Sequence, residues 1–228
     1  MVRESEVIFE LLEYVGKQMD GKVEYWDALF DRQSSCTISK DNVDERIALP
    51  EFAGIQIRSF KNGVWRSAST FRLEKERLKE LALKLVKLRQ ETKNRVRLRE
   101  QKPSKLDIAM RVEKSPSDIS LESKVNDARS FHKAATNLDK RIINVVVQYG
   151  DSKIERIFVN SEGSSMRQIV TRTRLALVPV ARENDKIRMG FESMGGTKGY
   201  EVVEKCDFDA VAKKTVESSL EQLKAQTP

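Results

Sequence analysis

The order of the predicted elements constrains the fold of this chain more than any other feature of its sequence. Apolar residues at one-, three- and four-residue steps predict a first helix, with Val7, Leu11 and Val15 on its buried stripe. Short β-rich runs follow, and a leucine-striped helix over 78–88 closes this half. Because the strands come in runs flanked by helices, and do not alternate with helices one by one, the pattern predicts an α+β fold with antiparallel sheets. The runs of this half are 24–31, 35–39, 45–49, 54–60 and 64–68, and Lys61-Asn62-Gly63 is a predicted hairpin turn.

The second half repeats this order. A helix over 121–138 precedes further β-rich runs, and a final helix carries an apolar stripe from Val211 to Leu223, with Asp207 or Asp209 placed to cap it. We therefore predict internally duplicated helix–strands–helix units over 1–99 and 121–228, with a linker or extended crossing segment over 100–120. Chance similarity between β-hairpins is the alternative to duplication. The runs of this half are 142–149, 153–159, 166–171, 174–180, 188–192 and 200–203.

The histidine and cysteine counts exclude several classes of site from this sequence. It holds one histidine, His132, and two cysteines, Cys36 and Cys206. No two-histidine metal site, zinc ribbon or iron–sulfur motif fits these counts. Sparse, unpaired thiols and the lack of a long apolar run lead us to expect a cytoplasmic protein without a membrane segment.

The glycine-rich stretch GFESMGGTKGY, residues 190–200, partly matches a phosphate-binding loop. Gly196 stands where that loop has its lysine, and no helix pattern follows, so a glycine hairpin is the favoured interpretation. A Cys/His dyad would need His132 as the base for either thiol, and a packed histidine on a helix is the simpler interpretation. Nothing in these residues specifies an enzyme.

Positive charge is concentrated in one segment of the chain. The 42 Lys and Arg outnumber the 35 Asp and Glu by 7, and residues 71–117 alone carry a net charge of +8. A nucleic-acid-associated binding protein that uses residues 84–105 is therefore the alternative function. No aromatic residue lies between Phe71 and Phe131 to stack on bases, and a solvated helix is the simpler interpretation. Nucleic acid is the less favoured partner.

Particular motifs of the chain resemble a known family. ISLESKV at 119–125, NSEG at 160–163, a long strand ending in Val180-Ala181, and GFESMGGTKGYE at 190–201 resemble the N-terminal domain of the TldD/PmbA family. These proteins are known as modulators of DNA gyrase and are understood as zinc metallopeptidases. The first half agrees more loosely, through SSCTISKDNVDERI and GIQIRSFKNGVWRSAST, and the ending GGTKGYE is more similar to the TldD branch than to PmbA.

The resemblance implies a substrate-access and assembly domain of a peptidase that degrades unfolded peptides. In the family the HExxxH zinc motif lies in a C-terminal domain that this sequence lacks, so no catalytic, cofactor or metal residue is assigned here, and the chain alone would be inert. The implied partners are that domain or a separate chain carrying it, a family member in a homo- or heterodimer, and a peptide substrate. A fragment, a split gene and a non-catalytic relative all stay open. We expect two loops, against the alternative of ordinary hairpin tips, to face the peptide channel or a partner: Ser161, Glu162 and Gly163, and Gly195, Gly196 and Gly199.

Overall fold

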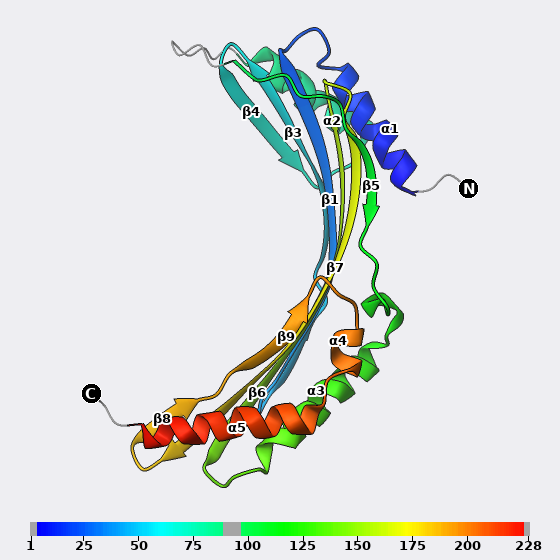
Figure 1. Ribbon diagram of the computed structural model, residues 1–228. Coiled ribbons are helices and arrows are strands. Elements are labelled where there is room, and N and C mark those ends of the chain that lie inside the picture. The colour runs from blue at the N-terminus through cyan, green and yellow to red at the C-terminus, as the bar shows by residue number, and fades with distance from the viewer. Residues whose placement is uncertain (1–3, 89–96, 226–228) are drawn as a thin grey trace. The chain divides into compact units, whose positions relative to one another are not determined.

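The computed structural model describes residues 4–88 and 97–225 and divides into two compact units (Figure 1). The first unit comprises Met1–Gln33, Glu51–Ala109 and Ile154–Val170, and the second comprises Ser34–Pro50, Met110–Lys153 and Thr171–Pro228. Both units are discontinuous in sequence, and each takes segments from both of the predicted ranges, 1–99 and 121–228. The internal duplication stays a prediction.

Three long strands contribute to both units: β1 (Tyr25–Lys40), β6 (Ile142–Asn160) and β7 (Ser165–Glu183). The sequence predicted each of them as two shorter strands, which is wrong. The predicted breaks fall on polar stretches such as Gly150-Asp151-Ser152, close to where each strand leaves one hydrophobic core for the other. The change of core removes the apolar alternation while the backbone stays extended.

In the first unit the strand order is β4-β3-β1-β6-β7-β5. Strands β3 (Glu51–Lys61) and β4 (Val64–Thr70) form an antiparallel hairpin closed by Asn62 and Gly63, with φ of 54° and 75°. Both angles are left-handed, as a two-residue type I′ turn requires, so the predicted hairpin is confirmed. Strand β5 (Lys105–Ala109) pairs in parallel with β7 and lies within the predicted 100–120 segment. All five of its residues are exposed. The sequence predicted a linker or crossing segment over this range, although Leu106 and Ile108 alternate with polar residues.

Helices α1 (Glu4–Lys17) and α2 (Lys75–Lys87) cover one face of this unit (Figure 1). Their apolar stripes form one core with inward residues of β1, β3 and β6, which confirms both predicted helices. Strand alternation places Trp26, Ala28 and Phe30 in that core, so Leu29 and Asp31 point to the opposite face. We call that opposite face the open face of the first unit.

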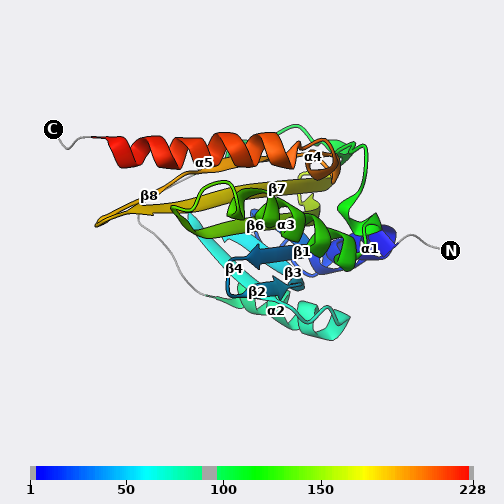
Figure 2. The same cartoon turned by 90° about the horizontal axis from the view of Figure 1, so that it is seen from below.

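In the second unit β2 (Glu45–Ala48) pairs with β1, and β8 (Lys186–Met189) and β9 (Glu192–Gly196) pair antiparallel with β7. Helices α3 (Leu121–Thr136) and α5 (Phe208–Lys224) run along these strands (Figure 2), and Phe131 of α3 stacks on Phe208 of α5 with ring centroids 4.9 Å apart. Asp207 caps α5 by accepting from the Ala210 N–H at 3.0 Å, as predicted. A short 3-10 helix, η1 (Pro116–Asp118), precedes α3. The α+β fold with antiparallel strands flanked by helices is confirmed.

The predicted strand over 200–203 is instead a helix, α4 (Glu201–Glu204). A short apolar run does not distinguish the two by itself. Tertiary hydrogen bonds decide it, because the Tyr200 N–H donates to the Lys114 carbonyl at 2.7 Å and fixes the start of the turn. Within the described ranges, none of the helices is both long and apolar enough to cross a membrane.

Candidate functional site

The glycine-rich segment is held flat against β7 in the second unit. Gly195 lies opposite Arg174 and Gly196 opposite Thr173 in the antiparallel β7–β9 pair. A Cβ on Gly195 would lie 2.5 Å from the Thr173 carbonyl oxygen, so only glycine fits there without a shift of the backbone. The outer strand β9 therefore lies closer to β7 than one with a side chain at this position could.

Gly199 is fixed in a similar way against the segment that follows β5. Its N–H donates to Glu201 Oε1 at 2.8 Å, and the Lys114 N–H donates to Glu201 Oε2 at 3.2 Å. A Cβ on Gly199 would lie 2.0 Å from the Lys114 carbonyl oxygen. Burial alone would raise the pKa of Glu201, but the N–H groups that bond its carboxylate lower it below the usual value. Glu201 therefore joins the glycine segment to the chain around Lys114 as a charged, buried anchor.

A groove of about 880 Å³ lies beside these glycines, entirely within the second unit. Backbone and side chains of β9 and α4 form part of it, and Arg111 and Glu113 contribute from the segment after β5. Glu113 forms an ion pair with Lys205, so the groove carries charges of both signs. Such a wall offers hydrogen-bond donors and acceptors and suits a polar, extended ligand. The other charged or polar residues of the groove are Ser193, Thr197, Lys198, Glu201, Cys206 and Asp207.

The second predicted loop lies in the first unit and is the turn between β6 and β7. Asn160 Oδ1 accepts from the N–H groups of Glu162 at 3.1 Å and Ser164 at 2.8 Å, and Gly163 has a left-handed φ of 86°. Ser161 bonds Trp26 twice, its N–H to the carbonyl at 2.9 Å and its Oγ from the N–H at 3.2 Å. The hydroxyl of Ser161 is thus used to hold β1 against the turn.

The six predicted site residues are therefore divided between the units, three in each. Gly195 lines the groove and Gly199 is bonded to Glu201 beside it, whereas Ser161, Glu162 and Gly163 form a hydrogen-bonded turn. The sequence missed Arg111 and Glu113, which lie about eighty positions before β9 and carried no motif. The helix α4 does follow the glycines, contrary to the sequence prediction, but its four residues and the absence of a lysine at Gly196 still disfavour a phosphate loop.

The second unit also buries an ionic network that the sequence did not single out. Lys124 Nζ of α3 lies 2.7 Å from Asp151 Oδ2 of β6, and both side chains are about nine-tenths buried. The Tyr149 hydroxyl donates to the same carboxylate oxygen, and its ring contacts that of Tyr200 edge-on at 6.0 Å. The Tyr200 hydroxyl donates to Asp127 Oδ2 at 2.6 Å. Burial, and to a smaller extent the neighbouring carboxylates, raise the pKa of Tyr149 and Tyr200 far above the usual value. Both hydroxyls therefore remain neutral donors.

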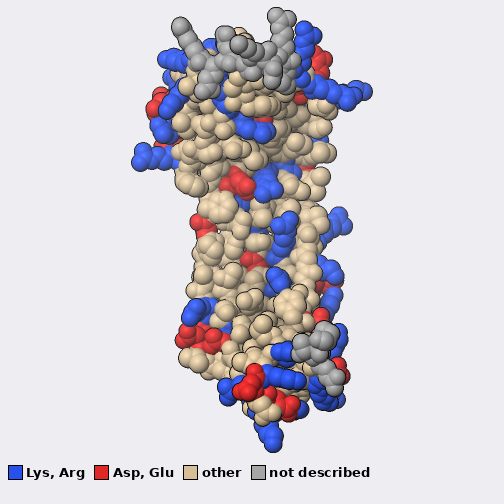
Figure 3. All heavy atoms as spheres, turned by 90° about the vertical axis from the view of Figure 1, so that its left-hand side faces the viewer, with Lys and Arg blue, Asp and Glu red and all other residues tan. Residues whose placement is uncertain are grey.

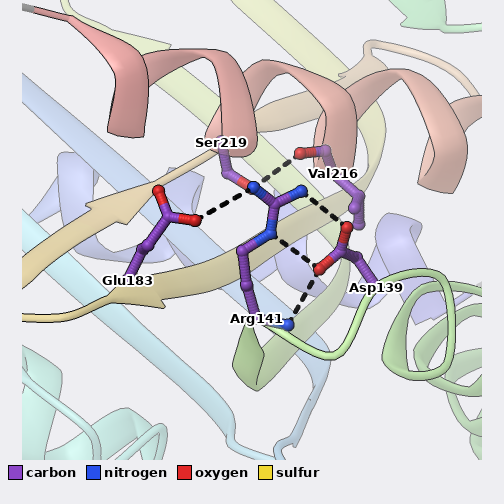
Figure 4. Close-up of polar contacts among 5 residues, drawn as sticks. All are labelled: Asp139, Arg141, Glu183, Val216 and Ser219. Atoms are coloured by element: carbon purple, nitrogen blue, oxygen red, sulfur yellow. Dashed lines mark hydrogen bonds and ion pairs between the residues drawn. The ribbon is translucent and has the colours of Figure 1, made fainter.

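A second charged cluster, drawn in Figure 4, lies beside Val216 and Ser219 of α5. Asp139 accepts three hydrogen bonds from Arg141, at 2.8 Å from its N–H, 2.9 Å from Nε and 2.8 Å from Nη2. Arg141 Nη1 also reaches Glu183 at the end of β7. These bonds lower the pKa of Asp139 to about 2. The cluster joins the start of β6 to the end of β7 and has a structural role.

The residues that could supply metal or thiol chemistry are dispersed. In residues 4–88 and 97–225 no group of three His, Cys, Asp or Glu side chains is placed to hold a metal ion. His132 Nε2 lies 2.9 Å from Asn42 Oδ1, and burial lowers the His132 pKa. Burial raises the pKa of Cys36 and raises that of Cys206 to about 11, so neither thiol is an activated nucleophile at neutral pH. Zinc, which the resemblance implies for the family, has no suitable donor set among these residues.

The basic segment of the alternative hypothesis is described only in part. Residues 89–96, at the centre of 84–105 and including Arg95, lie outside the described ranges. Lys84 and Lys87 lie in the last turn of α2, where cations stabilise the helix end. Nucleic-acid binding by this segment therefore stays a prediction.

Comparison with known proteins shows which family these elements resemble. Residues 114–223, which carry the buried network and most of the groove and of α5, match the sequence model described as the PmbA/TldA metallopeptidase central domain. The resemblance of this chain to the TldD/PmbA family is confirmed. Within this relationship, the matched segment corresponds to the family's central domain; assignment to the TldD branch stays a prediction.

Two metalloproteases are similar in sequence to nearly the whole of this chain. A metalloprotease of Methanothermobacter thermautotrophicus is 31% identical over 220 residues, covering 95% of this chain and 48% of that protein. A metalloprotease of Methanocaldococcus jannaschii is 28% identical over 226 residues, covering 97% of this chain and 48% of that protein. The chain thus spans about half the length of the curated relatives it matches.

Solved structures share the fold. A protein from Bacteroides thetaiotaomicron described as a modulator of DNA gyrase superposes with a TM-score of 0.77 at 16% identity, covering 96% of this chain and 50% of its own. TldE of Thermococcus kodakarensis gives a TM-score of 0.64 at 18% identity, covering 95% of this chain and 47% of its own. At such identities these likenesses show the fold, and the relationship to metallopeptidases comes from the sequence matches.

Proposed function

We propose that this chain is the substrate-access and assembly domain of a TldD/PmbA-type metallopeptidase that degrades unfolded peptides. Its own role is to bind peptide, and the catalytic zinc belongs to a C-terminal domain or to a separate chain. In this proposal the domain works in the cytoplasm and pairs with a second family member. The observation that carries the proposal is the groove of about 880 Å³, which lies mostly within the family match, is bordered by glycines and holds no metal donor set among the described residues.

The groove supports peptide binding through its chemistry. An extended peptide presents N–H and C=O groups along its whole length, and the outer strand β9 together with charged groups of both signs can bond them. Gly195 brings no side chain between this wall and a ligand, so a backbone can approach closely. Glu201 accepts from the Gly199 N–H, and the Tyr200 hydroxyl donates to Asp127, and these bonds fix the wall before a ligand arrives.

The test compares two glycine substitutions in strands of the second unit. Gly195→Ala places a methyl group 2.5 Å from the Thr173 carbonyl and must displace β9, whereas at Gly150 the nearest atom to an added methyl is 4.0 Å away. We expect Gly195→Ala to weaken binding of a fluorescein-labelled unstructured peptide about tenfold, at roughly 1.4 kcal/mol, and Gly150→Ala to leave it unchanged. Fluorescence anisotropy measures both, with circular dichroism as the check of folding.

If wild type and Gly195→Ala bound the peptide with equal affinity, the groove would not be the peptide-binding site. Failure of the wild-type chain to bind any unstructured peptide would overturn the peptide-binding function itself.

A further inference from the structure

The second unit has an open face as well, on the side of its strands that α3 and α5 do not cover. Ile38 of β1, Tyr149 of β6 and Leu175 of β7 lie in the helix-covered core, so the residues that alternate with them lie on the open face. Figure 3 is seen from this side, and in the middle of the view Lys and Arg side chains stand among uncharged ones. Exposed arginines of these strands occupy open-face positions: Arg46, which lies opposite Ser39, and Arg172, Arg174 and Arg182 of β7.

The acidic residues of the same strands do not balance this charge. They form ion pairs on the helix-covered side, Glu45 with Arg129, Asp151 with Lys124, Glu183 with Arg141 and Glu192 with Lys214. Asp44, in the turn before β2, pairs with Arg46 at 2.8 Å. Arg174 differs, because its guanidinium forms no ion pair or hydrogen bond with any residue of 4–88 or 97–225. The open face of the second unit therefore presents an arginine whose charge is free to pair with an anion.

Arg174 lines a cavity of about 340 Å³ that extends over β2, β1, β6 and β7. Arg46 lines it too, and none of the described residues around it is an Asp or a Glu. The hydroxyls of Thr37 and Ser39 and the amide of Gln148 offer further hydrogen-bond donors. Gly150 borders the cavity without a side chain, and even a methyl group there would meet no atom closer than 4.0 Å. The cavity thus has room for a small group and falls at the lower end of the volumes that hold ligands.

These donors suit a carboxylate. A guanidinium can donate two parallel N–H bonds to the two oxygens of a carboxylate, which gives both charge and geometry to the pairing. Arg174 lies opposite Gly195 of β9, which lines the groove, so β9 places no side chain beside Arg174 that would block a peptide bound there. A nucleic acid suits the face less. Tyr149 is the one aromatic residue of these strands, all of which are described, and it lies in the helix-covered core, so no ring is left to stack on bases.

We infer that the cavity at Arg174 binds a carboxylate of an unfolded peptide, either an Asp or Glu side chain or the C-terminus. The Arg174 guanidinium donates to the two carboxylate oxygens, and Thr37, Ser39 and Gln148 supply further donors. This inference rests on the proposed peptide-binding function and adds a preference for negative charge at a site next to the groove. It predicts that the chain selects among unfolded peptides by charge.

The experiment uses fluorescein-labelled unstructured peptides that are amidated at the C-terminus and differ only at one central residue, which is glutamate, glutamine or lysine. Wild type is expected to bind the glutamate peptide about fivefold more tightly than the glutamine peptide, the upper range for a partly exposed ion pair, and the lysine peptide least. The glutamine peptide with a free C-terminal carboxylate separates the two sources. A preference for it over its amidated form assigns the cavity to the C-terminus, and a preference for central glutamate assigns it to acidic side chains.

Arg174→Gln should remove the preference for the carboxylate peptides, and Arg174→Glu should reverse it in favour of lysine. Because Arg174 is exposed, both variants should fold, with circular dichroism as the check. The matched control is Arg182→Gln, which removes the same charge from the same face of β7 but lies outside the cavity and should keep the preference.

Two results would overturn the inference and leave the proposed function standing. One is equal binding by wild type of the glutamate, glutamine and free-carboxylate peptides. The other is loss of the preference in Arg182→Gln as well as Arg174→Gln, because the effect would then follow net charge. A single-stranded oligonucleotide that bound wild type more tightly than the glutamate peptide, and lost this affinity in Arg174→Gln, would assign the cavity to nucleic acid and also overturn it. Binding of none of the peptides would overturn both the inference and the proposed function.

Discussion

The two units bury charged side chains in different surroundings. In the first unit Asp27 is buried in a bidentate pair with Arg58, whose side chain is 45% exposed, and Arg66 is buried as well. The second unit buries Lys124 with Asp151, and also Glu201, beside its apolar cluster. Buried ion pairs add little net stability but strongly constrain geometry once formed. The difference indicates that the second unit holds a specific arrangement, that of the glycine segment and its groove.

The chain carries separate spectroscopic probes for the two units. Both tryptophans, Trp26 and Trp65, belong to the first unit, and both cysteines, Cys36 and Cys206, belong to the second. Tryptophan fluorescence therefore reports the first unit, and protection of the thiols from alkylation reports the second. The following predictions use these probes to test whether the units differ as their cores do.

The largest effect is expected from Asp151→Ala. It leaves the Lys124 ammonium buried without its carboxylate, which should lower the free energy of unfolding by about 4 kcal/mol. Urea unfolding followed by thiol alkylation measures the loss, and replacing the pair together, Lys124→Met with Asp151→Leu, should restore most of it. An equal shift of the unfolding transition seen by tryptophan fluorescence would show that the two units unfold as one, and would contradict their independent unfolding.

A comparable change in the first unit is Leu12→Ala. Leu12 is fully buried between the helices and the sheet, so its truncation should cost about 3 kcal/mol. Tryptophan fluorescence in urea measures this. The matched control is Val7→Ala on the same helix, which should cost much less because Val7, contrary to its predicted place on the buried stripe, is half exposed. If the cysteines of this variant became alkylated at the same urea concentration as in wild type, the loss would be confined to the first unit. If Leu12→Ala cost no more than Val7→Ala, the assignment of Leu12 to this core would be contradicted.

The smallest effect is a pH dependence confined to the second unit. The pKa of Asp139 is lowered from 3.8 to about 2 by Arg141, so the folded state binds its proton less readily than the unfolded state. The stabilisation is complete above pH 3.8 and is lost as the pH falls toward 2. The difference in unfolding free energy between wild type and Asp139→Asn should therefore shrink across that window. A difference that stays constant there would show that Asp139 has an ordinary pKa.

The helices and the fold class could be predicted from the sequence because they depend on local patterns. The stripe of Leu11 and Val15 and the cap at Asp207 act within one or two turns, and both are confirmed. The long strands were divided wrongly, since residues such as Gly150 look like a turn until the neighbouring strands hold them extended. The alternation in sequence does not reveal that a strand passes from one core to another.

The candidate site could be predicted only in part, for a similar reason. The glycines of β9 carried a visible motif, whereas Arg111 and Glu113 reach the groove through tertiary structure alone. Lys124 did leave a signal, because it occupies a buried position on the stripe of α3 between Val125 and Leu121, where a charged side chain needs a partner.

The central claim is that this chain binds unfolded peptide but does not hold the catalytic metal. Native mass spectrometry of the purified chain, mixed with an equimolar amount of zinc and an unstructured peptide, tests this most directly. The account predicts a complex of chain and intact peptide, without a retained zinc ion. A chain that retains one zinc ion and converts the peptide to fragments unaided would contradict it.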